Sequence, residues 1–292
     1  MTVLPIVSSS SLRRRPTRRV VGIALSRPAV AVSVVFLAAV VLAAVWPTLF
    51  TDVDPNGARA EDTLLAPGAD HLFGTDQNGR DLFARIVHAA RPSLLIGLSA
   101  SALALVVGAT IGVLAAAGGR RTDWTFTRLL DVLMSVPGLL FVLLVIAVRG
   151  PGTGTTIVAV ALISVPGYAR LVRAETLRLR GSAFVEAARA LGWSHTRVVL
   201  RHVVPNALGP VLVLATIGIG STIGVVASLS FLGLGPQPPT AEWGSMLSTS
   251  RDYFSVAWWP AVFPGLAITL TVLSVTVVGQ HLQRRLEGRG PA

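Results

Sequence analysis

Residues 186–205 read Glu-Ala-Ala-Arg-Ala-Leu-Gly-Trp-Ser-His-Thr-Arg-Val-Val-Leu-Arg-His-Val-Val-Pro and form a polar, basic segment between two long apolar stretches. The first part predicts a short helix over 183–191, because alanines surround the acidic Glu186 and Gly192 follows the last helical position. Gly192 would supply the left-handed stop common at helix C-termini. A connection between two membrane helices can be much shorter, so we interpret this segment as a docking element for a second protein.

The composition is that of a membrane protein. Hydrophobic residues make up 52% of the chain and charged residues 13%, against about 25% charged in a typical soluble domain. The chain has no cysteine, which excludes a disulfide framework and a thiolate metal site. All 25 basic residues are arginines, and they cluster beside apolar stretches. The formal charge of +11 therefore indicates membrane topology rather than nucleic-acid binding.

Six apolar stretches are each long enough to cross a membrane, which takes about 20 residues. The first follows a cluster of arginines, as the core of a signal peptide does, but it is too long and no small-residue cleavage site ends it. We therefore interpret it as an uncleaved anchor. The six stretches are 28–50, 93–117, 129–149, 153–173, 203–230 and 260–282.

The arginines predict the orientation of these stretches. With the N-terminus inside, nineteen arginines lie on the inner side and six on the outer side, which favours both termini in the cytoplasm. The predicted cytoplasmic segments are the basic N-terminus at 1–27, the long loop at 174–202 and the tail at 283–292. The segment at 51–92 is predicted to be extracytoplasmic.

The acidic residues restrict the kind of transport. All 14 lie in predicted loops except Asp131, near the inner end of the third stretch, where Arg128 is one helical turn away and is its predicted partner. A proton- or sodium-coupled transporter carries ionisable groups inside its spans, and none is predicted here. The chain also lacks a Gly-x-x-x-x-Gly-Lys-Ser/Thr phosphate loop. Energy for uphill transport would therefore come from another protein.

Two other classes remain as alternatives. An intramembrane enzyme needs a nucleophile with a base or a metal cluster, but the predicted spans contain serines and, apart from His281 at the end of the last one, no histidine. A passive channel would need no docking loop. Both alternatives are therefore less favoured than a transporter driven by a partner protein.

Two further segments carry recognisable patterns. Residues 71–97 contain Phe-Gly-Thr-Asp76 and Gly-Arg-Asp81, which predict tight turns, followed by an amphipathic external helix that leads into the second span. Asp76 and Asp81 would serve either as turn residues or as contacts to an external partner. Residues 228–247, rich in glycine and proline, predict an external connection after the fifth span.

The chain resembles the C-type permease subunit of dipeptide, oligopeptide and nickel ABC importers. The long polar loop matches the EAA motif of these permeases, and the two external segments match them in the same order. Val226 stands where many relatives carry a glutamate, and Val204 and His202 depart from the usual Leu and Ile of the motif. The matching motif residues are Glu186, Ala187, Ala188, Gly192 and Pro205.

The resemblance implies an all-α membrane protein with six transmembrane helices and the type I ABC importer permease fold. An N-terminal helix at 28–50 would precede a five-helix core at 93–282. The implied partners are a B-type permease in a heterodimer, two ATPase subunits and an extracytoplasmic solute-binding protein, all at a bacterial inner membrane. ATP and magnesium would bind the ATPases, and this chain would bind no cofactor or metal and perform no catalysis. The expected solute is a peptide, with nickel or another small solute as the alternative.

Overall fold

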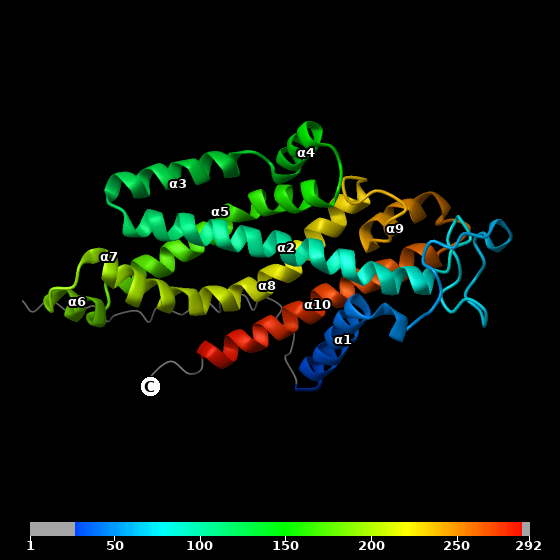
Figure 1. The fold of residues 1–292 in the computed structure, drawn as a ribbon, viewed down its shortest axis with the longest axis horizontal. Coiled ribbons are helices and arrows are strands. Elements are labelled where there is room, and N and C mark those ends of the chain that lie inside the picture. Colours follow the sequence, from blue (N-terminus) through cyan, green and yellow to red (C-terminus); the bar gives the residue numbers. More distant parts are fainter. Residues whose placement is uncertain (1–26, 288–292) are drawn as a thin grey trace, which may run out of the picture.

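The computed structural model describes residues 27–287, and in this part of the chain the regular structure is entirely helical (Figure 1). Five of the helices are long and apolar enough to cross a membrane. The main helices are α1 (Arg27–Val45), α2 (Leu82–Ala117), α3 (Arg120–Ser135), α4 (Gly138–Arg149), α5 (Thr153–Arg180), α6 (Ala183–Ala190), α7 (His195–Val198), α8 (Val204–Phe231), α9 (Trp243–Ser250) and α10 (Trp259–Glu287). Short 3-10 turns lie at Pro47–Leu49, Ala60–Asp62 and Arg251–Tyr253.

Helix α2 begins earlier than the sequence predicted. Its N-cap is Asp81, whose carboxylate accepts a hydrogen bond of 2.8 Å from the Ala84 amide. The sequence predicted an external helix that leads into a span from residue 93, and the structure makes the two one continuous helix of 36 residues that runs through Pro92. The neighbouring Ser93 is buried and donates a hydrogen bond of 3.2 Å to Glu242. Packing against α9 thus supports the helix at its proline.

The centre of the molecule is the crossing of α2 and α5. A Cβ atom on Gly108 would lie 2.9 Å from the Val165 carbonyl oxygen, so only a glycine allows this approach. Near the same crossing, the Tyr168 and Ser101 hydroxyls are 3.1 Å apart. Small residues that let two backbones approach closely are the usual basis of helix packing in membranes.

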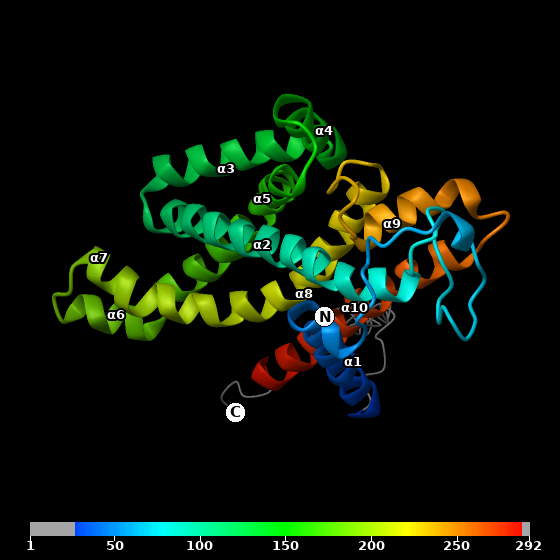
Figure 2. The ribbon, with the colours of Figure 1, turned by 45° about the vertical axis from the view of Figure 1, so that its right-hand side comes forward.

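The third predicted span, 129–149, is wrong as a single straight helix. α3 and α4 meet at an angle of 87° around Val136 and Pro137, so a sixth span exists only if this bent pair is counted as one. The residue before a proline is pushed out of the α-helical region, and Val136 is extended, with φ −87° and ψ 127°. Figure 2 shows α4 turned away from the direction of α3.

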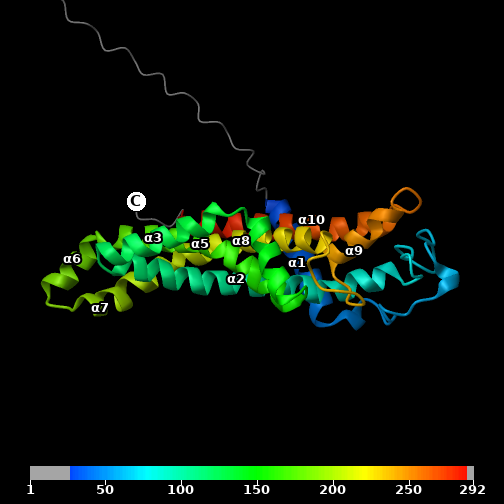
Figure 3. The same ribbon diagram turned by 90° about the horizontal axis from the view of Figure 1, so that it is seen from above.

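The long helices lie in a shallow layer, which is clearest from above in Figure 3. α1 packs against α10 and α2, and α8 packs between α2, α5 and α10. Many large apolar side chains on these helices are exposed, among them Val35 at 70% and Val106 at 64%. A single chain therefore leaves wide apolar faces for lipid or for another subunit.

The predicted turns between Phe73 and Asp81 form a buried clasp at the end of the molecule opposite α6. The Phe73 ring stacks on Phe263 of α10 with centroids 4.1 Å apart. The Asp76 carboxylate, 4% exposed, accepts a 2.8 Å hydrogen bond from Arg80 Nε and lies 3.4 Å from Arg85 Nε. Asp76 was predicted to be either a turn residue or a contact to an external partner. In the structure its side chain accepts hydrogen bonds within the turn, from the Asn78 and Arg80 amides.

Candidate coupling segment

Helix α6 lies at one end of the molecule, beyond the C-terminal end of α5 (Figure 1). The predicted helix over 183–191 is present as Ala183–Ala190, with Glu186 in its first turn. Its inward face consists of Val185 and Ala188, which pack in a cluster with Leu179 and the start of α8. Glu186 and Ala187 are exposed. The two alanines of the motif therefore differ, because only Ala187 is open to a partner.

A Schellman motif ends α6. The Trp193 amide donates to the Ala188 carbonyl at 3.2 Å, and the Gly192 amide donates to the Arg189 carbonyl at 2.9 Å. Gly192 has φ +80°, the left-handed conformation that the sequence predicted and that costs other residues about 1–2 kcal/mol. A Cβ atom on Gly192 would meet no atom within 4 Å. Backbone conformation alone, and not lack of space, requires glycine there.

Sequence reasoning missed Trp193. Its ring packs against the cluster that contains Ala188, and the guanidinium groups of Arg197 and Arg201 lie 5.7 and 5.9 Å from its centroid. Arginines at this distance from an indole are attracted by the ring. The arginines follow Trp193 by four and eight residues, a spacing that brings them to the ring because residues 195–203 continue as helical turns. Trp193 thus holds α6 against the start of α7.

The candidate coupling segment, which we define as residues 180–205, is tied to the end of α2. The side chain of Arg180 donates a hydrogen bond to the Ala116 carbonyl oxygen, and His195 Nε2 lies 3.0 Å from the Ala117 carbonyl oxygen. The last carbonyl groups of a helix have no partner within the helix, and basic side chains are favourable there. A displacement of α6 and α7 would therefore pull directly on α2.

Pro205 stands at the start of α8, directly after a π-helical turn at Val199–Val203. Proline has no amide hydrogen and its ring collides with the carbonyl four residues earlier, which favours a wider turn in front of it. The Asn206 side chain donates to the His202 carbonyl at 2.6 Å. Single π turns are frequent at functional sites. Pro205 thus lies where the coupling segment enters a long helix.

Two ion pairs join α3 to α5 near the same end. Arg173 holds Asp123 with hydrogen bonds of 2.5 and 2.7 Å, and Arg170 holds Asp131 at 2.6 Å. The predicted pairing of Asp131 with Arg128 is therefore wrong. Arg170 reaches Asp131 from the adjacent helix, a contact that spacing along α3 cannot reveal.

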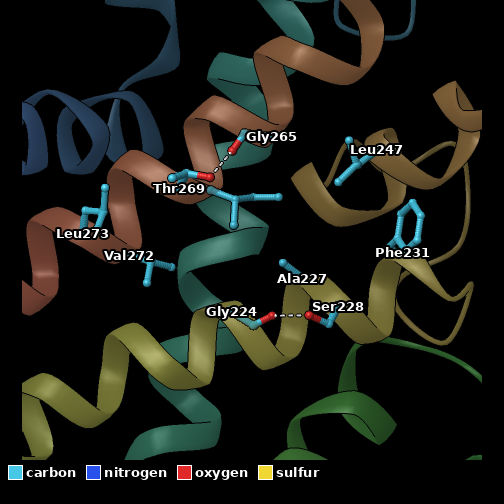
Figure 4. A pocket seen from close by; sticks show the side chains of 10 residues that line it. Gly224, Ala227, Ser228, Phe231, Leu247, Gly265, Thr269, Val272 and Leu273 are labelled. Atoms are coloured by element: carbon cyan, nitrogen blue, oxygen red, sulfur yellow. Dashed lines mark hydrogen bonds between the residues drawn. The ribbon is translucent and has the colours of Figure 1, made fainter. Parts of the chain in front are cut away.

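A cavity of about 500 Å³ opens between α8, α9 and α10 (Figure 4). Its hydroxyl groups are satisfied within their own helices, because Ser228 donates to Gly224 at 2.9 Å and Thr269 donates to Gly265 at 2.8 Å. The lining contains no charged side chain. Val226 is buried beside Leu229 in an apolar cluster, so the position where relatives often carry glutamate belongs here to the core. The cavity fits an apolar cover better than a charged solute.

Comparison with known proteins gives a consistent result. Residues 108–289 match the family described as the binding-protein-dependent transport system inner membrane component. A dipeptide transport system permease protein DppC of Alkalihalophilus pseudofirmus is 38% identical over 256 residues, 88% of this chain and 84% of the relative. A putative peptide transport system permease of Brucella suis is 42% identical over 258 residues, 88% of this chain and 87% of the relative. A glutathione transport system permease GsiD of Pectobacterium atrosepticum is 35% identical over 98% of this chain and 95% of its own length.

The fold has solved counterparts. A chain of the MetNI methionine ABC transporter in an inward-facing conformation aligns with a TM-score of 0.57 and 19% identity, over 69% of this chain and 96% of that one. This likeness confirms the predicted type I ABC importer permease fold. The chain belongs to the family of binding-protein-dependent transport system inner membrane components, as a multi-pass membrane protein. Within that family it is a C-type permease subunit, as the sequence predicted.

Proposed function

We propose that this chain forms half of the translocation path of an ATP-driven peptide importer and is coupled to ATPase subunits through α6. The observation that carries the proposal is the shape of α6, a short helix at the end of the bundle. It is anchored on one face by Val185 and Ala188 and exposed on the other through Glu186 and Ala187. The permease relatives support the transport role, and their names support a peptide as the solute.

The exposed surface of the segment suits a protein partner. Phe184, Leu191 and Leu200 are 44%, 78% and 63% exposed. Phe184 shares α6 with Glu186 and Arg189, which are exposed too, Leu191 directly follows that helix, and Leu200 lies in the π turn before α8. An apolar centre with charged neighbours is a common composition of a protein interface. Motion of a partner bound here would reach α2 through Arg180 and His195 and α8 through Pro205.

The proposed partners are supported by the family and by the apolar faces that one chain leaves exposed. A B-type permease would cover the faces that one chain leaves open, two ATPase subunits would bind α6 and its counterpart, and an extracytoplasmic protein would deliver the solute to the other end. Both termini and α6 would lie in the cytoplasm. The chain itself would bind no cofactor and hydrolyse no ATP, because ATP and magnesium would be held by the ATPase subunits.

The direct test is uptake into proteoliposomes. We expect a labelled dipeptide to accumulate with ATP when the B-type permease, the ATPases and the binding protein are present with this chain. The chain alone, in equal amount, is expected to transport nothing and to bind no ATP. Parallel assays with nickel ions test the alternative solute. Accumulation by the chain alone would refute the proposal, and uptake of nickel without uptake of peptide would refute the choice of solute.

A further inference from the structure

One face of α3 carries a basic patch that lies outside α6. Arg120, Trp124 and Arg128 follow one another at intervals of four residues and therefore lie along one face of the helix. Arg121 stands beside the first of them. All four side chains are exposed, Trp124 to 66%. We call these four residues the α3 basic patch.

The three arginines of this patch have no acidic partner among the described residues. The two nearby carboxylates, Asp123 and Asp131, are held by Arg173 and Arg170 of α5. Five arginines therefore stand against two aspartates in this region. The excess of positive charge is a site for an anion that the chain itself does not supply.

Two cavities adjoin the patch and share Arg120 and Trp124. One, of about 400 Å³, lies between α3 and α5 and is also lined by Arg128, Thr127 and the paired aspartates. The hydroxyl of Thr127 is buried and has no hydrogen-bond partner. The other cavity, of about 620 Å³, opens outward beside Arg121. The patch is thus hollowed rather than flat, and one polar group at its base lacks a partner.

The character of α3 changes sharply after Arg128. The residues that follow include Leu129, Val132 and Met134, which are 59%, 60% and 51% exposed. Tryptophan and arginine are enriched where a membrane meets water, and leucine and valine in its hydrocarbon interior. The sequence of α3 therefore places the basic patch at the level of lipid headgroups and the apolar half at the level of acyl chains.

We propose that the α3 basic patch binds the phosphate headgroup of an anionic phospholipid in the leaflet on the α6 side. Arginine forms paired hydrogen bonds to phosphate oxygens, and basic pockets beside membrane helices on the cytoplasmic side bind anionic headgroups. The acyl chains of the same lipid would lie along Leu129 and Val132. The patch lies on α3 and not on α6, and the proposal does not depend on the identity of the solute.

The test is a titration of the purified full-length chain in detergent with phosphatidylglycerol, followed by native mass spectrometry. The variant Arg120→Gln/Arg121→Gln/Arg128→Gln is expected to weaken phosphatidylglycerol binding at least about tenfold, since each basic residue near an anionic surface contributes separately. Phosphatidylcholine should bind weakly to both proteins. The triple Arg→Lys variant at the same positions keeps the charge and should retain most of the affinity.

A matched control removes the same charge elsewhere. The variant Arg91→Gln/Arg149→Gln/Arg251→Gln takes three exposed arginines from other parts of the surface and should bind phosphatidylglycerol like the wild type. Soluble glycerol phosphate should compete poorly, because it lacks the acyl chains. If the first triple variant folds poorly by circular dichroism, Arg120→Gln and Arg128→Gln alone should each weaken binding.

Four outcomes would overturn the proposal. They are unchanged phosphatidylglycerol affinity in the α3 variants, equal loss in the control variant, competition by glycerol phosphate as strong as that of the lipid, and loss of ATPase-subunit binding in the α3 variants with lipid binding intact. The last result would assign the patch to a protein contact. All four are measured without transport, so the uptake assay can succeed or fail independently.

Discussion

A Cβ atom on Gly112 of α2 would lie 2.6 Å from the carbonyl oxygen of Ala169 on α5. No real side chain can be accommodated at that distance unless the two helices move apart. The contact lies beside the crossing at Gly108, so α2 and α5 touch backbone to backbone along one turn of each helix. The stability of the whole bundle should therefore be sensitive to a single methyl group here.

Gly112→Ala should destabilise the chain by about 1–3 kcal/mol, the usual cost of inserting atoms into a close-packed contact. Thermal unfolding of the purified protein in detergent measures the change. Gly167→Ala on α5 is the matched control, because a Cβ atom there meets nothing within 4 Å, and alanine favours a helix over glycine. A midpoint unchanged in Gly112→Ala would show that the helices are not in backbone contact.

Gly192→Val should abolish or strongly reduce uptake by the complete importer. A β-branched side chain in the left-handed region costs at least about 1–2 kcal/mol and would redirect the chain after α6. Gly181→Val is the control, since Gly181 flanks the same helix with φ −90°. Glu186→Gln should have a smaller effect, because an acid near a helix start contributes about 0.3–1 kcal/mol.

Membrane insertion and expression should be unaffected by all three changes, because none lies in a long apolar helix. Uptake measured at equal expression separates coupling from assembly. Wild-type uptake by Gly192→Val would show that the segment is only a connector.

Asp76→Ala should destabilise the clasp at residues 73–81. The substitution removes the carboxylate that pairs with Arg85, whose side chain is buried with the residue 5% exposed. Breaking a buried ion pair in this way lowers the free energy of unfolding by about 3–5 kcal/mol. We expect faster limited proteolysis within residues 51–81. The exposed Asp70 has no hydrogen bond or ion pair in the structure, so Asp70→Ala should be cleaved at the wild-type rate. Equal rates for all three proteins would mean that the clasp does not depend on Asp76.

The Asp123–Arg173 pair should hold α3 to α5. A double-mutant cycle with Asp123→Asn and Arg173→Gln measures the coupling energy of this pair. We expect about 1 kcal/mol, the top of the range for exposed ion pairs, because Arg173 donates two hydrogen bonds to the carboxylate. The Glu175–Arg178 pair lies within α5, with the arginine side chain 64% exposed, and should give about 0.5 kcal/mol or less. Equal couplings would contradict the expectation, and unfolding in detergent measures both.

Cysteine labelling tests the orientation, since the chain has no native cysteine. Ala58→Cys, exposed in the segment between α1 and α2, should react with a membrane-impermeant maleimide in intact cells from which the outer membrane has been removed. Ser194→Cys, exposed beside α6, should react only after the inner membrane is opened. The reverse pattern would place α6 outside and exclude cytoplasmic coupling.

Local sequence patterns predicted much of this protein. Apolar runs of about 20 residues predicted the long helices, because burial of apolar surface is a property of the residues themselves. The stop at Gly192 was also predictable, since the left-handed conformation is a local preference of glycine. The Glu-Ala-Ala motif predicted the helix α6, but not that Ala188 faces inward while Ala187 faces outward.

Other features were decided only when distant segments met. Pro137 within the run at 129–149 marks where the helix can break, but the sequence did not set the 87° angle between α3 and α4. The partner of Asp131 is Arg170 of α5, and Trp193 packs against a cluster that joins Leu179 of α5 to Ala207 of α8. Sequence determined which segments form helices and where they stop, because those choices depend on neighbours along the chain. Tertiary structure decided their directions and ionic partners, because these depend on how closely two backbones can approach.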